Sequence, residues 1–233
     1  RDPEELQLLL EEARRLAEGL TRIGRLAGRK CAAVITDMDQ PLGWAVGNAL
    51  EVKEAIEVLK GEKDGDLLEL CLTLGSCMLT EAGKAESIEQ ARDMLKDSIS
   101  SGAALKKLSL MVSAQHGDGA DVYDTSRLPL APVQYEVLSE EGGYVRRIEA
   151  ESVGLVSMHL GGGRATKDSK IDLSVGLVLH KKVGDKVEPG ESLATIHASG
   201  REKAEEAAEL LRTCFSFNEQ PVEPGSFIKA VVR

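Results

Sequence analysis

Aromatic residues are scarce in this 233-residue sequence: Phe, Tyr and Trp together make up 3%, and there is one Trp. We therefore expect a core built mainly from Leu, Val, Ile and Ala. A basic excess is also lacking, because the formal net charge is −10. A nucleic-acid partner is not expected, since such partners require a broad basic field that displaces counterions.

Long apolar runs are missing too. The sequence shows no secretory leader and no apolar stretch of about 18 residues, so we predict neither secretion nor membrane insertion and expect a cytoplasmic protein. Cysteine is limited to Cys31, Cys71, Cys77 and Cys214, whose spacing does not suit a metal site. We interpret these four residues as reduced, buried thiols.

The remaining composition is that of an ordinary globular protein. Hydrophobic residues make up 42% and charged residues 29% of the sequence. A chain of this length can bury a sizeable core, in one large domain or in two.

The most informative stretch runs from residue 31 to residue 61. Residues 31–35, CAAVI, predict a buried strand, and Pro41 and Gly43 then force a loop. After Gly47 the apolar residues repeat with helical spacing until Gly61, which supplies a stop. Strand, loop and helix in this order are typical of ligand sites at the carboxyl ends of strands. The predicted apolar face of the helix comprises Leu50, Val52, Ala55, Ile56 and Leu59.

The first half of the sequence is predicted to be mainly helical. Asp2 and Pro3 have the residue types of a helix start, and a capping box begins at Ser87. Gly, Asp and Pro residues at 117–132 predict a linker. The expected helices span residues 2–28, 66–81, 87–102 and 103–115.

The second half has the pattern of short strands mixed with helices. Residues 134–138 and 144–148 alternate apolar and polar side chains around Gly142–Gly143, which predicts a hairpin. Further strands are expected at 175–179, 192–197 and 226–232, with a turn at 183–190. Helices are expected at 153–160 and 201–211.

Residues 41–56, PLGWAVGNALEVKEAI, resemble the corresponding segment of pyrimidine-nucleoside and thymidine phosphorylases. Three further blocks agree in the same order, at residues 102–105, 161–172 and 175–185. The resemblance covers nearly the whole chain but only the C-terminal portion of the family, and a first residue of Arg1 fits a fragment. It implies an α/β fold, with a partial helix-flanked sheet domain at 1–128 and a smaller α+β C-terminal domain with hammerhead-like, biotinyl/lipoyl-type strands at 129–233.

The resemblance also implies an activity and a cation site. The complete enzymes are homodimers that transfer a pentosyl group from a pyrimidine nucleoside to phosphate, and they hold a monovalent cation, usually potassium. The family's positions match Leu42 and Ala45, through their carbonyls, and Glu54, through its carboxylate. Without the resemblance, Glu54 would be interpreted as a solvated helix residue that pairs with neighbours of Lys53 or with Arg29.

The family's upstream segments have no counterpart in these 233 residues. They include the glycine-rich phosphate loop and the side chains that bind phosphate and the pyrimidine ring. We therefore assign no catalytic residue, predict an incomplete potassium site, and expect the isolated chain to be inactive.

Other candidates for chemistry are weaker. Asp37 and Asp39 could form a carboxylate pair, but a loop-capping role is the better interpretation. The scattered histidines suit packing or surface roles. Gly161–Arg164 is interpreted as a turn rather than an anion site, because it lacks the strand–loop–helix order. Trp44 either shields the site or packs.

The main alternative is a non-catalytic binding or scaffold module with a biotinyl/lipoyl-like fold. The sequence VGDKVEPGESLATI at 183–196 resembles the turn and strand of such carriers. Lys181 and Lys182 are the candidate attachment sites, but both lack the flanking residues of true carriers.

Overall fold

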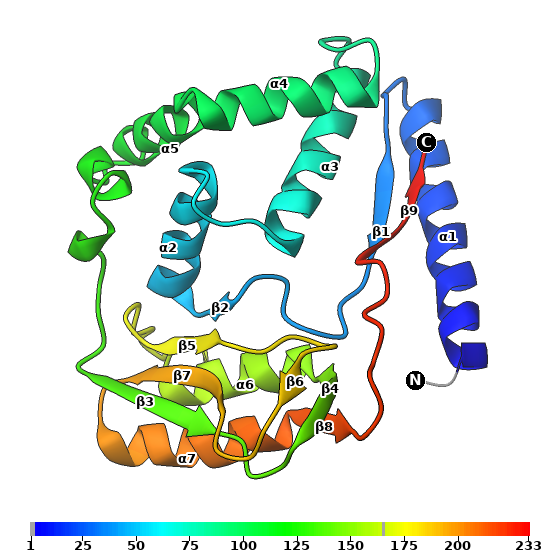
Figure 1. The fold of residues 1–233 in the computed structure, drawn as a ribbon. Coiled ribbons are helices and arrows are strands. Elements are labelled where there is room, and N and C mark those ends of the chain that lie inside the picture. The colour runs from blue at the N-terminus through cyan, green and yellow to red at the C-terminus, as the bar shows by residue number, and fades with distance from the viewer. Residues whose placement is uncertain (1–2, 165) are drawn as a thin grey trace. The chain divides into compact units, whose positions relative to one another are not determined.

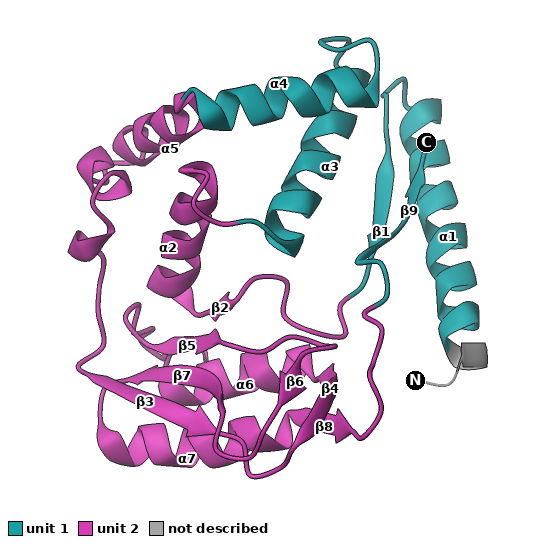
Figure 2. Ribbon diagram, in the orientation of Figure 1, with its two compact units in different colours: residues 1–37, 64–101, 225–233 teal, residues 38–63, 102–224 magenta. Residues whose placement is uncertain are grey.

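The computed structural model describes residues 3–164 and 166–233, and its contacts divide the chain into two compact units. Unit 1 comprises residues up to 37, residues 64–101 and residues 225–233, and unit 2 comprises residues 38–63 and 102–224 (Figure 2). Neither unit is a single continuous segment, so both cut across the boundary at 128/129 that the sequence predicts.

Unit 1 combines three helices with a two-stranded sheet. Its strands, β1 (Ala33–Thr36) and β9 (Ile228–Val232), pair antiparallel although they lie at opposite ends of the sequence (Figure 1). The helices are α1 (Pro3–Leu26), α3 (Asp66–Glu81) and α4 (Ile88–Ser100). The predicted helices and both predicted strands of this region are therefore confirmed, within a few residues, but β1 is half-buried rather than buried as predicted.

The predicted capping box before α4 forms in part, because Gln90 contacts the N–H group of Glu86 rather than that of the cap residue Ser87. Ser87 Oγ accepts a hydrogen bond from Gln90 N at 3.1 Å, and Gln90 Oε1 accepts one from Glu86 N at 2.7 Å. The predicted capping role of Asp2 at α1 lies outside the described residues. α1 exposes several large apolar side chains, among them Leu16, Leu20, Ile23 and Leu26.

Unit 2 contains two antiparallel sheets. The four-stranded sheet has the order β2 (Ala45–Val46), β5 (Gly176–Leu179), β7 (Ser192–Ala198) and β3 (Val133–Leu138). The three-stranded sheet has the order β6 (Lys186–Val187), β4 (Gly143–Ile148) and β8 (Phe215–Asn218). The strands β2, β6 and β8, which are only two to four residues long, were not predicted from the sequence.

Helices and short 3-10 turns complete unit 2. They are α2 (Asn48–Leu59), α5 (Ala103–Ala114), η1 (Gly119–Val122), η2 (Thr125–Arg127), α6 (Ala150–Leu160) and α7 (Arg201–Thr213). α7 packs on β3 and β7, and α6 packs on α7 and β5 (Figure 1). The resulting core is aliphatic, as the scarcity of aromatic residues predicts, and includes the fully buried Leu177, Ile196 and Leu211.

The hairpin predicted at 134–148 is wrong. β3 pairs with β7 and β4 pairs with β6 and β8, so the two strands belong to different sheets. The connection turns away from β3 where Ser139 N donates to Glu191 O at 2.8 Å. Alternation of apolar residues shows which face of a strand is buried but not which strand is its neighbour.

Three smaller predictions also need correction. Val52 is 49% exposed, so it does not belong to the buried face of α2 with Leu50 and Ile56. Cys71 is exposed rather than buried, whereas all four cysteines are free thiols, as predicted. The region predicted as a linker contains η1, whose Val122 is buried against Ile56 and Leu105.

None of the helices in the described part of the chain combines the length and the apolar character needed to cross a bilayer.

Candidate functional site

The candidate site is the loop between β1 and α2, together with the first turns of α2. Two glycines permit its close backbone approaches. A Cβ at Gly43 would lie 2.3 Å from Glu54 Oε2, and Gly47, at φ +140°, would place one 2.6 Å from Val175 O. The glycines thus allow the loop to lie directly against the Glu54 carboxylate and against β5.

Glu54 is buried, with 4% of its surface exposed. Its Oε1 accepts a hydrogen bond from Trp44 N at 2.8 Å, and its Oε2 accepts one from Ala45 N at 3.0 Å. The interpretation of Glu54 as a solvated helix residue is therefore wrong. Both oxygens accept hydrogen bonds from backbone N–H groups, which satisfy the buried carboxylate.

The C=O group of Ala45 points to the same side of β2 as its N–H group, away from β5. Trp44 O accepts a hydrogen bond from Leu179 N at 2.7 Å, which makes Trp44 and Leu179 the hydrogen-bonded pair of the ladder between β2 and β5. The next pair, Ala45 and Val178, is then non-hydrogen-bonded, so the N–H and C=O of Ala45 both point away from β5. Ala45 N reaches Glu54, and Ala45 O is directed toward that side of β2.

The carbonyl of Leu42 faces a positive charge. Lys182 Nζ lies 3.4 Å from Leu42 O and 2.7 Å from Gly43 O, and it also donates to Pro41 O. From the sequence, Lys182 is a candidate only for carrier attachment, and this contact was not predicted. No local signal reveals it, because about 140 residues separate the two partners.

Leu42, Ala45 and Glu54 therefore offer two backbone carbonyls and one buried carboxylate. Oxygen ligands of this kind suit a hard cation, and a buried carboxylate without a basic side chain at its oxygens favours one nearby. The donor set thus fits potassium in chemical type. Within the described residues, no group of three or more His, Cys, Asp or Glu side chains is placed to hold a metal ion.

Trp44 packs rather than lying free. It is partly buried against the aliphatic core of unit 2, and its ring centroid lies 5.3 Å from Lys182 Nζ. Asp37, for which the sequence favours a loop-capping role over a carboxylate pair with Asp39, forms an ion pair with Lys229 at 2.8 Å, which ties the end of β1 to β9.

The histidines occupy separate places and form no catalytic constellation. His159 Nε2 lies 3.2 Å from Glu206, and His180 lies between Ser192 and Thr195. His197 is buried in β7, and its pKa is lowered by burial and then by the charge of Lys53. These are packing and surface roles, as predicted.

The glycines at 161–163 form a turn after α6, as predicted. Gly161 has φ +108°, and Gly162 O accepts a hydrogen bond from Asn48 Nδ2 at 2.8 Å. A hollow of about 410 Å³ lies between this turn and the first turn of α2.

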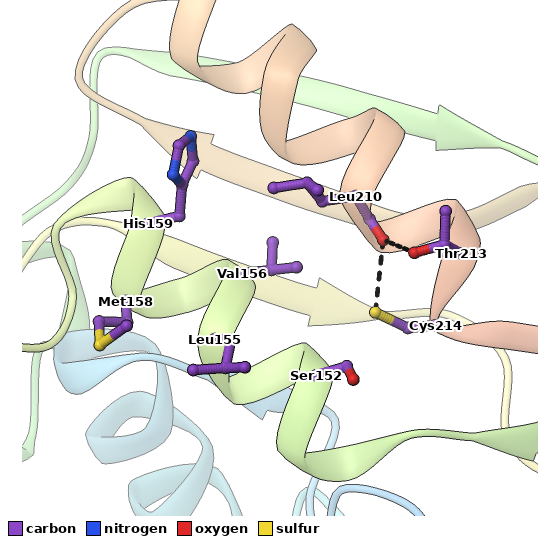
Figure 3. Close-up of a pocket in the computed structure, with 8 residues that line it drawn as sticks. All are labelled: Ser152, Leu155, Val156, Met158, His159, Leu210, Thr213 and Cys214. Atoms are coloured by element: carbon purple, nitrogen blue, oxygen red, sulfur yellow. Dashed lines mark hydrogen bonds between the residues drawn. The ribbon is translucent and has the colours of Figure 1, made fainter. Parts of the chain in front are cut away.

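A larger pocket, of about 610 Å³, lies between α6 and α7 (Figure 3). Its lining is mainly apolar, and Cys214 lies at its edge with Sγ 3.4 Å from Leu210 O. Burial, followed by the charge of Glu149, raises the pKa of the Cys214 thiol to about 11. The thiol is therefore protonated at neutral pH and is a poor nucleophile.

Comparison with known proteins finds matches in both halves of the chain. The family model described as "Glycosyl transferase family, a/b domain" matches residues 9–105, and "Pyrimidine nucleoside phosphorylase C-terminal domain" matches residues 144–218. The chain is 49% identical over 219 residues to a pyrimidine-nucleoside phosphorylase of Geobacillus stearothermophilus. The chain belongs to the pyrimidine-nucleoside phosphorylase family.

Two further relatives extend the similarity over almost the whole chain. Pyrimidine-nucleoside phosphorylases of Staphylococcus aureus strains MSSA476 and USA300 are 46% and 47% identical over 96% and 92% of the chain. The alignments cover 51% and 49% of these relatives, and 50% of the Geobacillus protein. The chain thus spans about half the length of the curated relatives it matches.

Proposed function

We propose that this chain is part of a pyrimidine-nucleoside phosphorylase, which converts a pyrimidine nucleoside and phosphate into a free base and a pentose 1-phosphate. The observation that carries this proposal is the 46–49% identity over more than nine-tenths of the chain to proteins of that name. In such an enzyme, bound phosphate attacks a sugar with oxocarbenium character while positive groups stabilise the departing base.

Within that enzyme, Leu42, Ala45 and Glu54 would contribute one side of a potassium site. The buried Glu54 carboxylate and the outward-pointing Ala45 carbonyl support this role. A bound potassium ion would supply positive charge close to the phosphate and nucleoside. The residues of this chain would orient it, because the two N–H groups of Trp44 and Ala45 fix the carboxylate in one position.

The isolated chain is expected to be inactive, because we find no residues in it for binding phosphate or the pyrimidine ring. The complete enzyme is expected to work as a cytoplasmic homodimer. The test is to follow uracil or thymine release from uridine or thymidine with and without phosphate. No release by the chain alone is expected. Phosphate-dependent turnover would contradict the proposal that the residues that bind phosphate and the pyrimidine ring lie outside this chain.

The C-terminal strands are proposed to have a biotinyl/lipoyl-like arrangement without carrier function. Two antiparallel sheets and the turn at 183–190 support the likeness. A carrier would display its lysine, whereas Lys181 Nζ contacts Lys186 O and Glu191, and Lys182 Nζ contacts the 41–43 carbonyls. Intact-mass measurement of the protein from its native source would instead favour a carrier if a biotin or lipoyl adduct appeared.

A scaffold function remains the second candidate for the chain. A scaffold would need no glycine-rich phosphate loop, which the complete enzymes of the family have. Purification of the native protein distinguishes the two: a phosphorylase is expected to contain that loop, in the same or an associated chain, and a scaffold is not.

A further inference from the structure

The ammonium group of Lys182 is surrounded by backbone carbonyl oxygens, as a bound metal ion would be. Three successive carbonyls, those of Pro41, Leu42 and Gly43, face the same Nζ atom. Carbonyl oxygens carry partial negative charge, and three of them at one point would repel one another without a cation between them. Lys182 therefore supplies an internal cation to this loop.

Several neighbouring contacts hold this lysine and the loop together. Val183 N donates to Gln40 Oε1 at 3.0 Å, and Lys182 N donates to Asp185 Oδ2 at 2.7 Å. The Lys182 ammonium also lies 5.3 Å from the centroid of the Trp44 ring. These contacts hold the turn before β6 and the loop before β2 in place around Lys182.

The preceding lysine offers an internal comparison. Lys181 Nζ lies 2.9 Å from Glu191 Oε1 and 3.1 Å from Lys186 O, so it binds within its own turn. The two lysines are adjacent in the sequence and equal in charge, but of the two only Lys182 contacts the 41–43 carbonyls. Lys181 is therefore a matched control for Lys182.

We propose that Lys182 is a positioning residue that holds the Leu42 carbonyl in place and biases the adjacent cation site toward monovalent ions. This inference rests on the cation site proposed above, because Leu42 O is expected to be shared between the ammonium group and the bound ion. A divalent ion feels twice the repulsion from the Lys182 charge that a monovalent ion feels. It also feels twice the attraction to the Glu54 carboxylate, so replacing Lys182 changes only the repulsive part. At an effective dielectric constant near 20 and a separation of a few ångström, the extra repulsion corresponds to roughly tenfold or more in affinity.

The single Trp of the chain is a built-in probe of this site. Trp44 fluorescence should be titrated with KCl and with CaCl₂ at constant ionic strength, using tetramethylammonium chloride to balance. The proteins to compare are the wild type, Lys182→Met, Lys182→Arg and Lys181→Met. Because a looser loop would weaken the binding of both ions, the informative quantity is the ratio of calcium to potassium affinity.

The expected result is a ratio at least about tenfold higher in Lys182→Met than in the wild type. Lys182→Arg keeps the charge and Lys181→Met keeps the contact, so both should retain the wild-type ratio. An unchanged ratio in Lys182→Met, or an equal rise in Lys181→Met, would overturn the proposal.

A further pair of measurements separates this inference from the cation site itself. If neither ion changes the wild-type fluorescence or melting temperature, Leu42, Ala45 and Glu54 do not bind a cation without the family's upstream ligands, and the charge preference proposed for this chain is wrong. Acrylamide quenching of Trp44 in cation-free buffer then decides the positioning role alone. Quenching is expected to increase by about twofold or more in Lys182→Met and to stay unchanged in Lys181→Met; equal quenching in the two variants would overturn that role.

Discussion

Unit 2 contains an apolar region and a polar region that are held together by opposite kinds of interaction. The interface of α6 and α7 with the sheets is aliphatic, and Leu160, Leu177 and Leu211 are at most 1% exposed. The loop at 41–46, by contrast, is fastened by polar contacts around a buried carboxylate and a lysine ammonium. The aliphatic region stabilises the fold by burying apolar surface. In the polar region, burying a carboxylate and an ammonium group costs free energy, but their hydrogen bonds hold the oxygens and charges in position.

The largest effect is expected where the aliphatic region is broken. Leu211→Ala should destabilise the chain by about 3 kcal/mol, because Leu211 is fully buried and its loss leaves a cavity. Leu210→Ala, the neighbouring residue at 46% exposure, should cost less than about 1 kcal/mol. Urea denaturation followed by circular dichroism measures both, and equal losses would mean that the α6–α7 interface is not a packed core.

The second-largest loss of stability is expected when the buried carboxylate of the polar region is removed. Glu54→Ala should cost about 2 kcal/mol or more, because it leaves the N–H groups of Trp44 and Ala45 without their acceptor. Glu51→Ala, on the exposed side of α2, removes one acceptor from Gly47 N and should cost about 1 kcal/mol. The same denaturation experiment compares them, and a Glu54→Ala variant as stable as Glu51→Ala would contradict the structural role of the carboxylate.

A smaller effect is expected on the pH dependence of stability. It concerns Cys214, a titratable group inside the apolar region, and therefore tests how strongly that region excludes water. Its pKa is raised from 9.0 to about 11, so the unfolded chain loses this proton at lower pH than the folded chain does. The stabilisation that Cys214 provides is therefore complete below pH 9 and declines as the pH rises toward 11, by about 2 kcal/mol in total.

The measurement is the difference in unfolding free energy between the wild type and Cys214→Ala at several pH values. This difference should shrink from pH 8.5 to pH 10.5, since other titrating groups cancel in it. Thr213→Ala, one residue away and without an ionisable group, should give a constant difference. A constant difference for Cys214→Ala as well would show that the thiol is not desolvated.

The sequence predicted the helices better than the pairing of the strands. The helices α1, α2 and α4 follow from local signals such as Pro3, Gly61 and the Ser87 capping box, which act within one or two turns. The strands β3 and β4 were found at the right residues, but their alternation does not encode partners, so the predicted hairpin was wrong. β2, with two residues, is too short to show a period of two, whereas β8 alternates apolar and polar residues and was still not predicted.

The site was predictable only through resemblance. Nothing in the spacing of Leu42, Ala45 and Glu54 shows that the carboxylate folds back onto the N–H groups of Trp44 and Ala45. The contact between Lys182 and the 41–43 carbonyls could not be predicted, because it joins segments about 140 residues apart and carries no motif of its own. Long-range polar contacts of this kind are visible only in the folded chain.

The most direct test of the cation site is X-ray diffraction from crystals of the chain grown with rubidium chloride in place of potassium chloride. Rubidium resembles potassium in charge and size and is located by its anomalous scattering. The account predicts an anomalous peak at bonding distance from Leu42 O, Ala45 O and the Glu54 carboxylate, and loss of that peak in Glu54→Gln. A well-ordered loop without a peak at these oxygens would contradict it.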